Sequence, residues 1–125
     1  MEKEFAAPCQ QNNILDNDFG FLLQEYVNIV KKIYKDSLLK IVLFGSYARG
    51  DYNDESDIDI MIFLNVPPHK ERRKIKELIG NTFDFNLDHN VDIQPIPKSI
   101  YTFRKWENIL PFYQTINKEG VILYE

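Results

Sequence analysis

Two short runs of branched apolar residues, at positions 39–44 and 57–64, constrain the fold of this chain more than any other feature. Each run has the length of a β-strand and is too short for a typical helix. The second run alternates, so a strand would place three isoleucines on one face. The opposite face would then carry Asp57, Asp59, Met61 and Phe63. We therefore expect two buried strands on either side of a polar turn at 45–56.

Helical spacing surrounds these strands. Apolar residues recur every three to four positions from 22 to 34, which predicts a helix with Asp18 as its N-cap. Pro67 and Pro68 end the second strand and are expected to open another helix. The apolar stripe of that helix would consist of Ile75, Leu78, Ile79 and Phe83.

The pattern in the last third of the chain predicts two more strands and two short helices. Residues 91–96 read as a strand, and Pro95 favours a place at the edge of a sheet or at the end of a strand. Ser99 could cap a helix that reaches about Trp106, and a second helix would begin at Pro111 and stop at Gly120. Residues 121–124 form a final short strand. The order αβαβαβα with a tail strand predicts a small α/β sandwich.

The chain has 125 residues, which suits one domain. We expect residues 1–17, which are polar and aperiodic, to form a flexible tail, and residues 18–125 to form the domain. No apolar run approaches the ~20 residues of a membrane helix, and we expect no secretory signal. A single cysteine, Cys9, cannot form an internal disulfide, so a cytoplasmic location is expected.

The net charge of −4 argues against a surface for duplex nucleic acid. Proteins that bind duplexes gain most of their affinity from basic residues that neutralise phosphates. We therefore expect no direct duplex binding. If this chain handles phosphates, it should do so through metal ions that carboxylates hold.

Three features could form such a site. Gly45 and Ser46 directly follow a predicted strand, and ten residues separate Ser46 from Asp57. Asp57 and Asp59 would lie side by side on one strand face, and Asp92 lies on the next strand. Adjacent carboxylates need a cation between them, and Mg²⁺ prefers oxygen ligands. Three carboxylates could hold two metal ions, while Gly45, Ser46 and nearby N–H groups could cradle an anion.

The segments Gly-Ser-Tyr-Ala-Arg-Gly at 45–50 and Ser-Asp-Ile-Asp-Ile at 56–60 resemble the signature of the polymerase-beta-type nucleotidyltransferases. Pro-Phe-Tyr at 111–113 and the ending at 119–124 resemble the minimal, single-domain branch of that superfamily. The resemblance covers about residues 20–125. It implies the small nucleotidyltransferase fold, with a mixed sheet packed against helices.

The resemblance also implies roles. Asp57 and Asp59 would ligate Mg²⁺ and anchor the triphosphate of ATP, and Asp92 would ligate a second metal ion and help deprotonate the acceptor hydroxyl. Gly45 and Ser46 would hold the β- and γ-phosphates. The minimal branch is similar to the antitoxins of toxin–antitoxin pairs, which transfer AMP to a tyrosine of a helical HEPN-type toxin. We expect no second, acceptor-binding domain in a chain of this length.

Several alternatives stay open. Asp88 could replace Asp92, Ser46 could be only a helix cap, and Arg49 could contact phosphate or clamp the loop against Asp51 or Asp54. The basic residues between 70 and 76 are expected on a solvated helix face, with an acidic partner as the alternative, and His69 and His89 lack metal-ligand spacing. The chain could instead sequester its partner without catalysis. It could also modify a small, aminoglycoside-like molecule as a homodimer.

Overall fold

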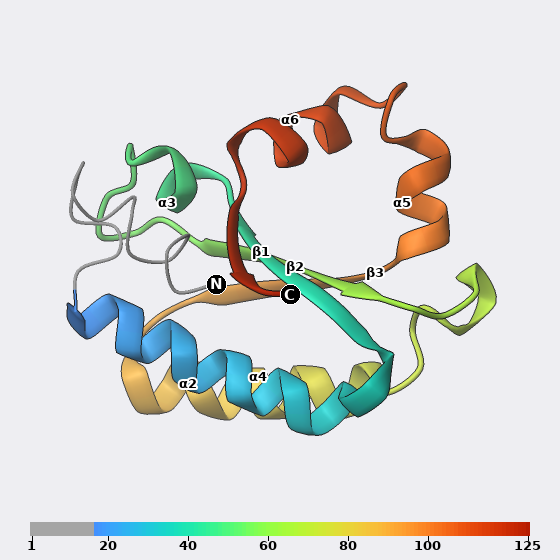
Figure 1. Ribbon diagram of the computed structural model, residues 1–125. Helices are drawn as coiled ribbons and strands as arrows, with labels where there is room; N and C mark the ends of the chain where they lie inside the picture. Colours follow the sequence, from blue (N-terminus) through green and yellow to red (C-terminus); the bar gives the residue numbers. More distant parts are fainter. Residues whose placement is uncertain (1–16) are drawn as a thin grey trace.

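A mixed four-stranded sheet with helices on both faces forms the protein in the computed structural model, which describes residues 17–125 (Figure 1). Two single 3₁₀ turns, η2 (Lys35–Ser37) and η3 (Pro68–Lys70), join larger elements. The larger elements are α2 (Asn17–Tyr34), β1 (Leu38–Phe44), α3 (Ser46–Arg49), β2 (Ile58–Leu64), α4 (Ile75–His89), β3 (Ile93–Ser99), α5 (Ile100–Trp106), α6 (Pro111–Glu119) and β4 (Val121–Tyr124). This order confirms the predicted α/β fold with its two short helices and tail strand.

The strand order is β3-β2-β1-β4, which makes β3 an edge strand as Pro95 suggested. β1 is antiparallel to both β2 and β4, whereas β2 and β3 are parallel. Phe44 lies opposite Asp59 across β1 and β2, and Ile58 lies opposite Ile93 across β2 and β3. The end of β1 and the starts of β2 and β3 therefore meet at the same end of the sheet.

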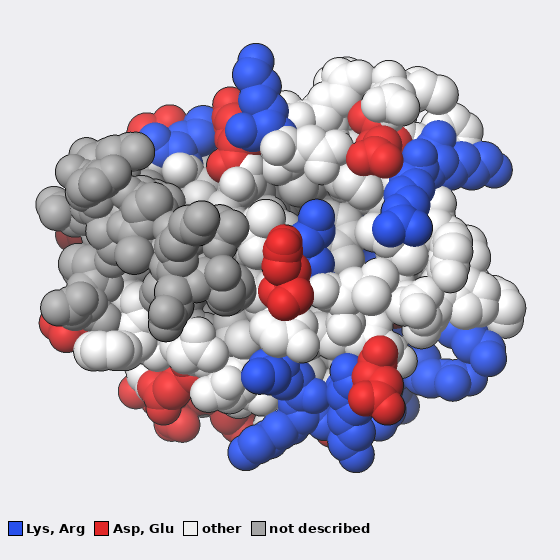
Figure 2. All heavy atoms as spheres, viewed as in Figure 1, with Lys and Arg blue, Asp and Glu red and all other residues white. Residues whose placement is uncertain are grey.

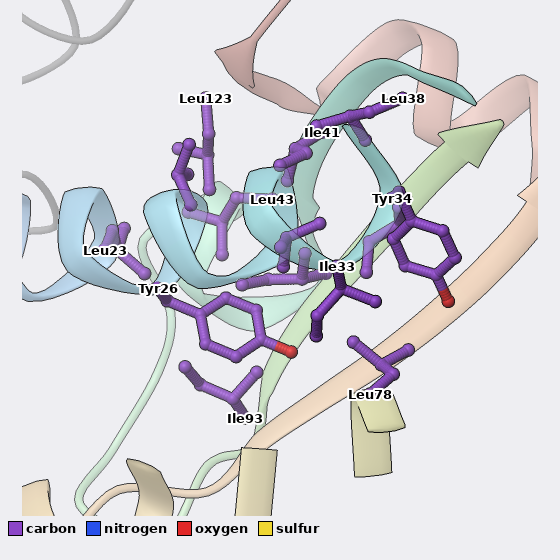
Figure 3. Close-up of a cluster of buried hydrophobic side chains, with 14 of the residues drawn as sticks. Leu23, Tyr26, Ile33, Tyr34, Leu38, Ile41, Leu43, Leu78, Ile93 and Leu123 are labelled. Carbon is purple, nitrogen blue, oxygen red and sulfur yellow. The ribbon is translucent and has the colours of Figure 1, made fainter. Parts of the chain in front are cut away.

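The larger hydrophobic core lies between one face of the sheet and the helices α2 and α4 (Figure 3). The isoleucines of β2 point into this core, as their alternation predicted. Tyr26 of α2 is fully buried there, and its hydroxyl hydrogen-bonds to that of Thr82 on α4 at 2.7 Å. This bond fixes the two helices side by side under the sheet.

A second core covers the opposite face under α5 and α6. Met61 and Phe63 of β2 point into it, and Phe63 packs edge-on against Phe103 with ring centroids 4.7 Å apart. Phe103 in turn stacks on Tyr113 of α6. Because Asp57 and Asp59 share the strand parity of Met61 and Phe63, they belong to this face of the sheet.

Two predictions at helix starts were wrong. Asp18 lies in the first turn of α2, where its charge favours the positive end of the helix, and it is not the N-cap. The prolines at 67 and 68 open only the turn η3, and α4 begins later, at Ile75. Asn17 already belongs to α2, and the rest of the predicted N-terminal tail, with Cys9, lies outside the described residues.

The apolar stripe of α4 was predicted only in part: Leu78 is fully buried and Ile75 packs against the core, as expected. Leu78, Thr82 and Phe85 are its buried positions, whereas Ile79 and Phe83 are 55% and 61% exposed. The sheet meets α4 on a face rotated from the one that apolar spacing suggested, since the Tyr26 hydroxyl holds Thr82 inward. Within residues 17–125, no helix is long and apolar enough to span a membrane.

Candidate functional site

Three chain segments converge at one end of the sheet. Gly45 follows β1, Asp57 directly precedes β2, and Asp92 directly precedes β3. The backbone N–H of Ile58 donates to the carbonyl of Asp92 at 2.9 Å, which continues the parallel pairing outward from the strands. Asp92 is therefore one residue ahead of its strand, not on it, and its side chain lies beside that of Asp57.

Gly45 makes the close approach of β1 to β2 sterically allowed. Its φ of 78° and ψ of −156° lie in a backbone region that residues other than glycine essentially avoid. A Cβ atom added there would overlap the Oδ2 atom of Asp59. The fold thus requires glycine at this position for two independent reasons, and the carboxylate of Asp59 lies against the bare backbone.

Ser46 opens the short helix α3, but Gly45 is the N-cap, and no side chain caps this helix. The carbonyl of Gly45 accepts hydrogen bonds from the N–H groups of Ala48 and Arg49. The reading of Ser46 as a helix cap is therefore wrong.

The acidic side chains perturb one another. A hydrogen bond with Asp92, followed by desolvation and by repulsion from Asp92 and Asp59, raises the pKa of Asp57 above its usual value. Burial raises the pKa of Asp59, Arg49 opposes that shift, and Asp92 adds to it. Three carboxylates thus share one electrostatic environment in which a further cation would be favourable.

Arg49 of α3 clamps the loop, which is one of the two roles predicted for it. Its Nε atom lies 3.2 Å from Oδ2 of Asp51, whereas within residues 17–125 no ion pair joins Arg49 to Asp54. Its Nη1 atom also lies 3.9 Å from Oε1 of Glu119 on α6. Residue spacing did not predict the contact with Glu119, because that contact depends on how α6 packs over the second core.

Asp88, the alternative to Asp92, lies elsewhere. It lines a cavity of about 440 Å³ together with Glu25 and His89, between α2 and α4. His89 stacks on the ring of Phe85, and its Nε2 atom lies 3.3 Å from Glu25. The structure therefore brings Asp92, and not Asp88, to Asp57.

A polar cavity of about 330 Å³ adjoins the carboxylates, and Tyr47, Asp54, Glu55, Asn90 and Asp92 are among its lining residues. Tyr47 stacks on Tyr52 with ring centroids 4.3 Å apart, which supports the loop that forms the cavity wall. Nothing in the spacing of these residues predicted the cavity, since loops distant in sequence build it.

The donor set fits a hard cation in an open site. Within residues 17–125, no three His, Cys, Asp or Glu side chains form a complete group for a metal ion. Mg²⁺ sites, however, commonly use one or two carboxylates and take their other ligands from water and substrate phosphates. The oxygen-only pair of Asp57 and Asp92, with Asp59 beside it, suits that arrangement.

Comparisons with known proteins agree with this geometry. A family model described as Nucleotidyltransferase domain matches residues 23–119. "Putative protein adenylyltransferase MJ0604" of Methanocaldococcus jannaschii is 38% identical over 102 residues, which cover 82% of this chain and 94% of the relative. "Putative protein adenylyltransferase MJ0141" of the same organism is 38% identical over 76 residues, 60% of this chain and 74% of the relative.

Among solved structures, the fold resembles a chain from a crystal structure of a toxin–antitoxin with AMP-PNP. The TM-score is 0.51 at 19% identity, with 81% of this chain and 72% of the other covered. At this identity the likeness concerns the fold alone.

Proposed function

The chain belongs to the nucleotidyltransferase domain family, and from that premise we propose that it is a Mg²⁺-dependent protein adenylyltransferase that acts as an antitoxin. Its donor would be ATP, and its acceptor a tyrosine hydroxyl of a HEPN-type toxin in the cytoplasm. The names of the two relatives support protein as the acceptor. The toxin–antitoxin structure with AMP-PNP supports a toxin partner and an adenine nucleotide.

The observation that carries the proposal is the convergence of Asp57, Asp59 and Asp92 beside Gly45. A structural role does not explain it, because gathering three carboxylates costs stability unless they hold a cation. Asp57, Asp59 and Asp92 would hold Mg²⁺. When bound, the ion would neutralise charge on the phosphates and favour their attack by a hydroxyl.

The residues of this chain then have distinct tasks in the transfer. Gly45 and Ser46 would hold the β- and γ-phosphates, since no side chain at 45 blocks the approach. Arg49, which stays half exposed in its ion pairs, would contact phosphate from the same loop.

The reaction itself breaks a phosphoanhydride bond of ATP and forms a phosphodiester bond to the acceptor. The acceptor oxygen forms a bond to the α-phosphorus of ATP, the bond from that phosphorus to the bridging oxygen breaks, and pyrophosphate leaves. Asp92 would accept the hydroxyl proton. The product is AMP joined to the acceptor side chain.

The test uses ATP labelled on its α-phosphate, Mg²⁺ and, as the acceptor, any HEPN-type helical protein encoded beside this gene. The wild type should transfer label to the partner, and the Asp57→Asn/Asp59→Asn double variant should not. Asp88→Asn is the matched control, because it removes a carboxylate that is close to Asp92 in sequence but lies outside the site. Undiminished transfer by the double variant would refute the mechanism.

The same assay separates the two alternatives. A partner that stays unlabelled yet is bound and neutralised would identify a binding module that acts by sequestration. Label on an aminoglycoside, together with a homodimer in solution, would identify a small-molecule enzyme.

A further inference from the structure

A groove of about 660 Å³ runs between α4 and the outer edge of β3 and adjoins the site just described. Asp92 lines the end of the groove nearest to the carboxylates. At the other end Lys98 pairs with Glu71 at 3.1 Å, beside Arg72. A segment bound along the groove would therefore lead directly to the residue proposed to accept the acceptor proton.

The walls of the groove are apolar and accessible. Ile79 and Phe83 of α4 are 55% and 61% exposed, and both face the groove together with Ile75. Pro95 and Pro97 line the opposite wall. Exposed apolar side chains gathered at a concave surface are typical of sites that bind a partner.

The edge of β3 cannot receive an added strand. The side chain of Asn86 already pairs with the N–H of Ile93 at 2.9 Å and with its carbonyl at 3.2 Å. Backbone groups alternate in direction along a strand, so the backbone groups of Pro95 and Pro97 point to the same edge as those of Ile93. Because proline has no N–H, these two positions offer no hydrogen-bond donor to an added strand. An extended segment would leave its own carbonyls without partners. A helix satisfies its backbone internally and needs only an apolar stripe to bind here.

The two ends of the groove differ in charge. The end remote from Asp92 carries a basic cluster, of which Arg72 lines the groove. Arg72 and Arg73 are exposed, and within residues 17–125 no carboxylate lies within ion-pair distance of either. The cluster comprises Lys70, Arg72, Arg73, Lys74 and Lys76. Its charge complements an acidic segment.

We infer that the groove between α4 and β3 docks an amphipathic helix of the acceptor protein, apolar toward Ile79 and Phe83 and acidic toward the basic cluster. This docking rests on the proposed adenylyl transfer and deepens it, because it sets where the acceptor hydroxyl enters. The acceptor residue lies beyond the end of the docked helix that is nearest to Asp92.

The experiment compares transfer of α-labelled AMP to the acceptor protein identified in the test above by the wild type, by Ile79→Glu/Phe83→Glu and by Arg72→Glu/Arg73→Glu. Ile109→Glu is the matched control, because Ile109 is 63% exposed on the turn after α5, across the sheet from the groove. Binding of ATP, measured by calorimetry, and melting temperature are recorded for each variant. The expected result is at least a tenfold lower kcat/KM for the acceptor in the Ile79/Phe83 variant. The arginine variant should lose less, and added salt should slow the wild type but not that variant.

Reduced transfer by the groove variants, with unchanged ATP binding and melting and with full activity of Ile109→Glu, would support the docking surface. Full transfer by the Ile79/Phe83 variant would overturn it while leaving the proposed function intact. Label that RNase rather than protease releases would also overturn it, since the acceptor would be RNA. A wild type that binds ATP but labels nothing would refute the proposed function, and the docking of an acceptor with it.

Discussion

Replacing Gly45 with alanine tests how the backbone and the carboxylates of the site depend on each other. Alanine at φ 78° and ψ −156° would cost about 1–3 kcal/mol in backbone strain. Its Cβ atom would also overlap Oδ2 of Asp59, and Cγ of that residue would lie 3.3 Å away. Displacing the half-buried carboxylate adds a second cost, so we expect Gly45→Ala to lose about 2–4 kcal/mol of unfolding free energy.

The two contributions can be separated by a double-mutant cycle with Asp59→Ala. Without the Asp59 carboxylate only the backbone strain remains, so Gly45→Ala should cost about 1–3 kcal/mol in that background. The difference between the two costs measures the steric coupling of Gly45 to Asp59. Urea unfolding followed by circular dichroism gives all four free energies.

Gly80→Ala is the matched control for this cycle. Gly80 lies inside α4, and an added Cβ atom would meet nothing within 4 Å. Alanine should therefore stabilise the protein there by about 0.5–1 kcal/mol through its helix propensity. The reasoning is refuted if Gly45→Ala costs the same in both backgrounds, or if it is as harmless as Gly80→Ala.

Three further outcomes follow from buried and clustered groups. Tyr26→Phe should lose about 1–3 kcal/mol in urea unfolding, because it leaves the buried Thr82 hydroxyl without its partner. Tyr34→Phe should be neutral or stabilising by about 1 kcal/mol, because the buried Tyr34 hydroxyl has no hydrogen-bond partner among residues 17–125. Burial also raises the pKa of Tyr34 to about 12, so the folded protein holds that proton more tightly than the unfolded chain. The wild type should therefore lose stability between about pH 10 and 12, and Tyr34→Phe should lose less in the same titration. Finally, the pKa of Asp57 is raised in the fold by Asp92, so this group stabilises the protein at low pH and ceases to do so as pH rises through the raised pKa. The stability gained by Asp57→Asn relative to the wild type should therefore be larger at pH 7 than at pH 4.5.

Local alternation predicted the parts of the fold that a single strand or turn determines. The isoleucines of β2 fill one core and Met61 with Phe63 fills the other, as the sequence pattern required. The short helices after Ser99 and Pro111 also begin where those residues suggested, since their start signals act within one turn. Such features need no knowledge of distant contacts.

Features that depend on packing between distant elements escaped prediction. Apolar spacing assigned Ile79 and Phe83 to the core, but the direction of α4 is decided by Tyr26, Thr82 and Phe85. Nor could spacing reveal that Asn86 occupies the edge of β3 or that Glu119 reaches Arg49. Each of these contacts joins segments whose meeting is set by tertiary structure.

The charge distribution of the molecule suggests that the site and the surface around it bind different partners. Figure 2 shows acidic and basic side chains mixed over the visible face, without one continuous basic surface. With a net charge of −4, the protein has no general attraction for phosphates. Binding of a triphosphate must then come from local groups, which are the cation that the three carboxylates favour, the open backbone at Gly45 and the guanidinium of Arg49. The basic cluster beside the groove is left free for a different task, which agrees with an acidic acceptor segment rather than with nucleotide binding.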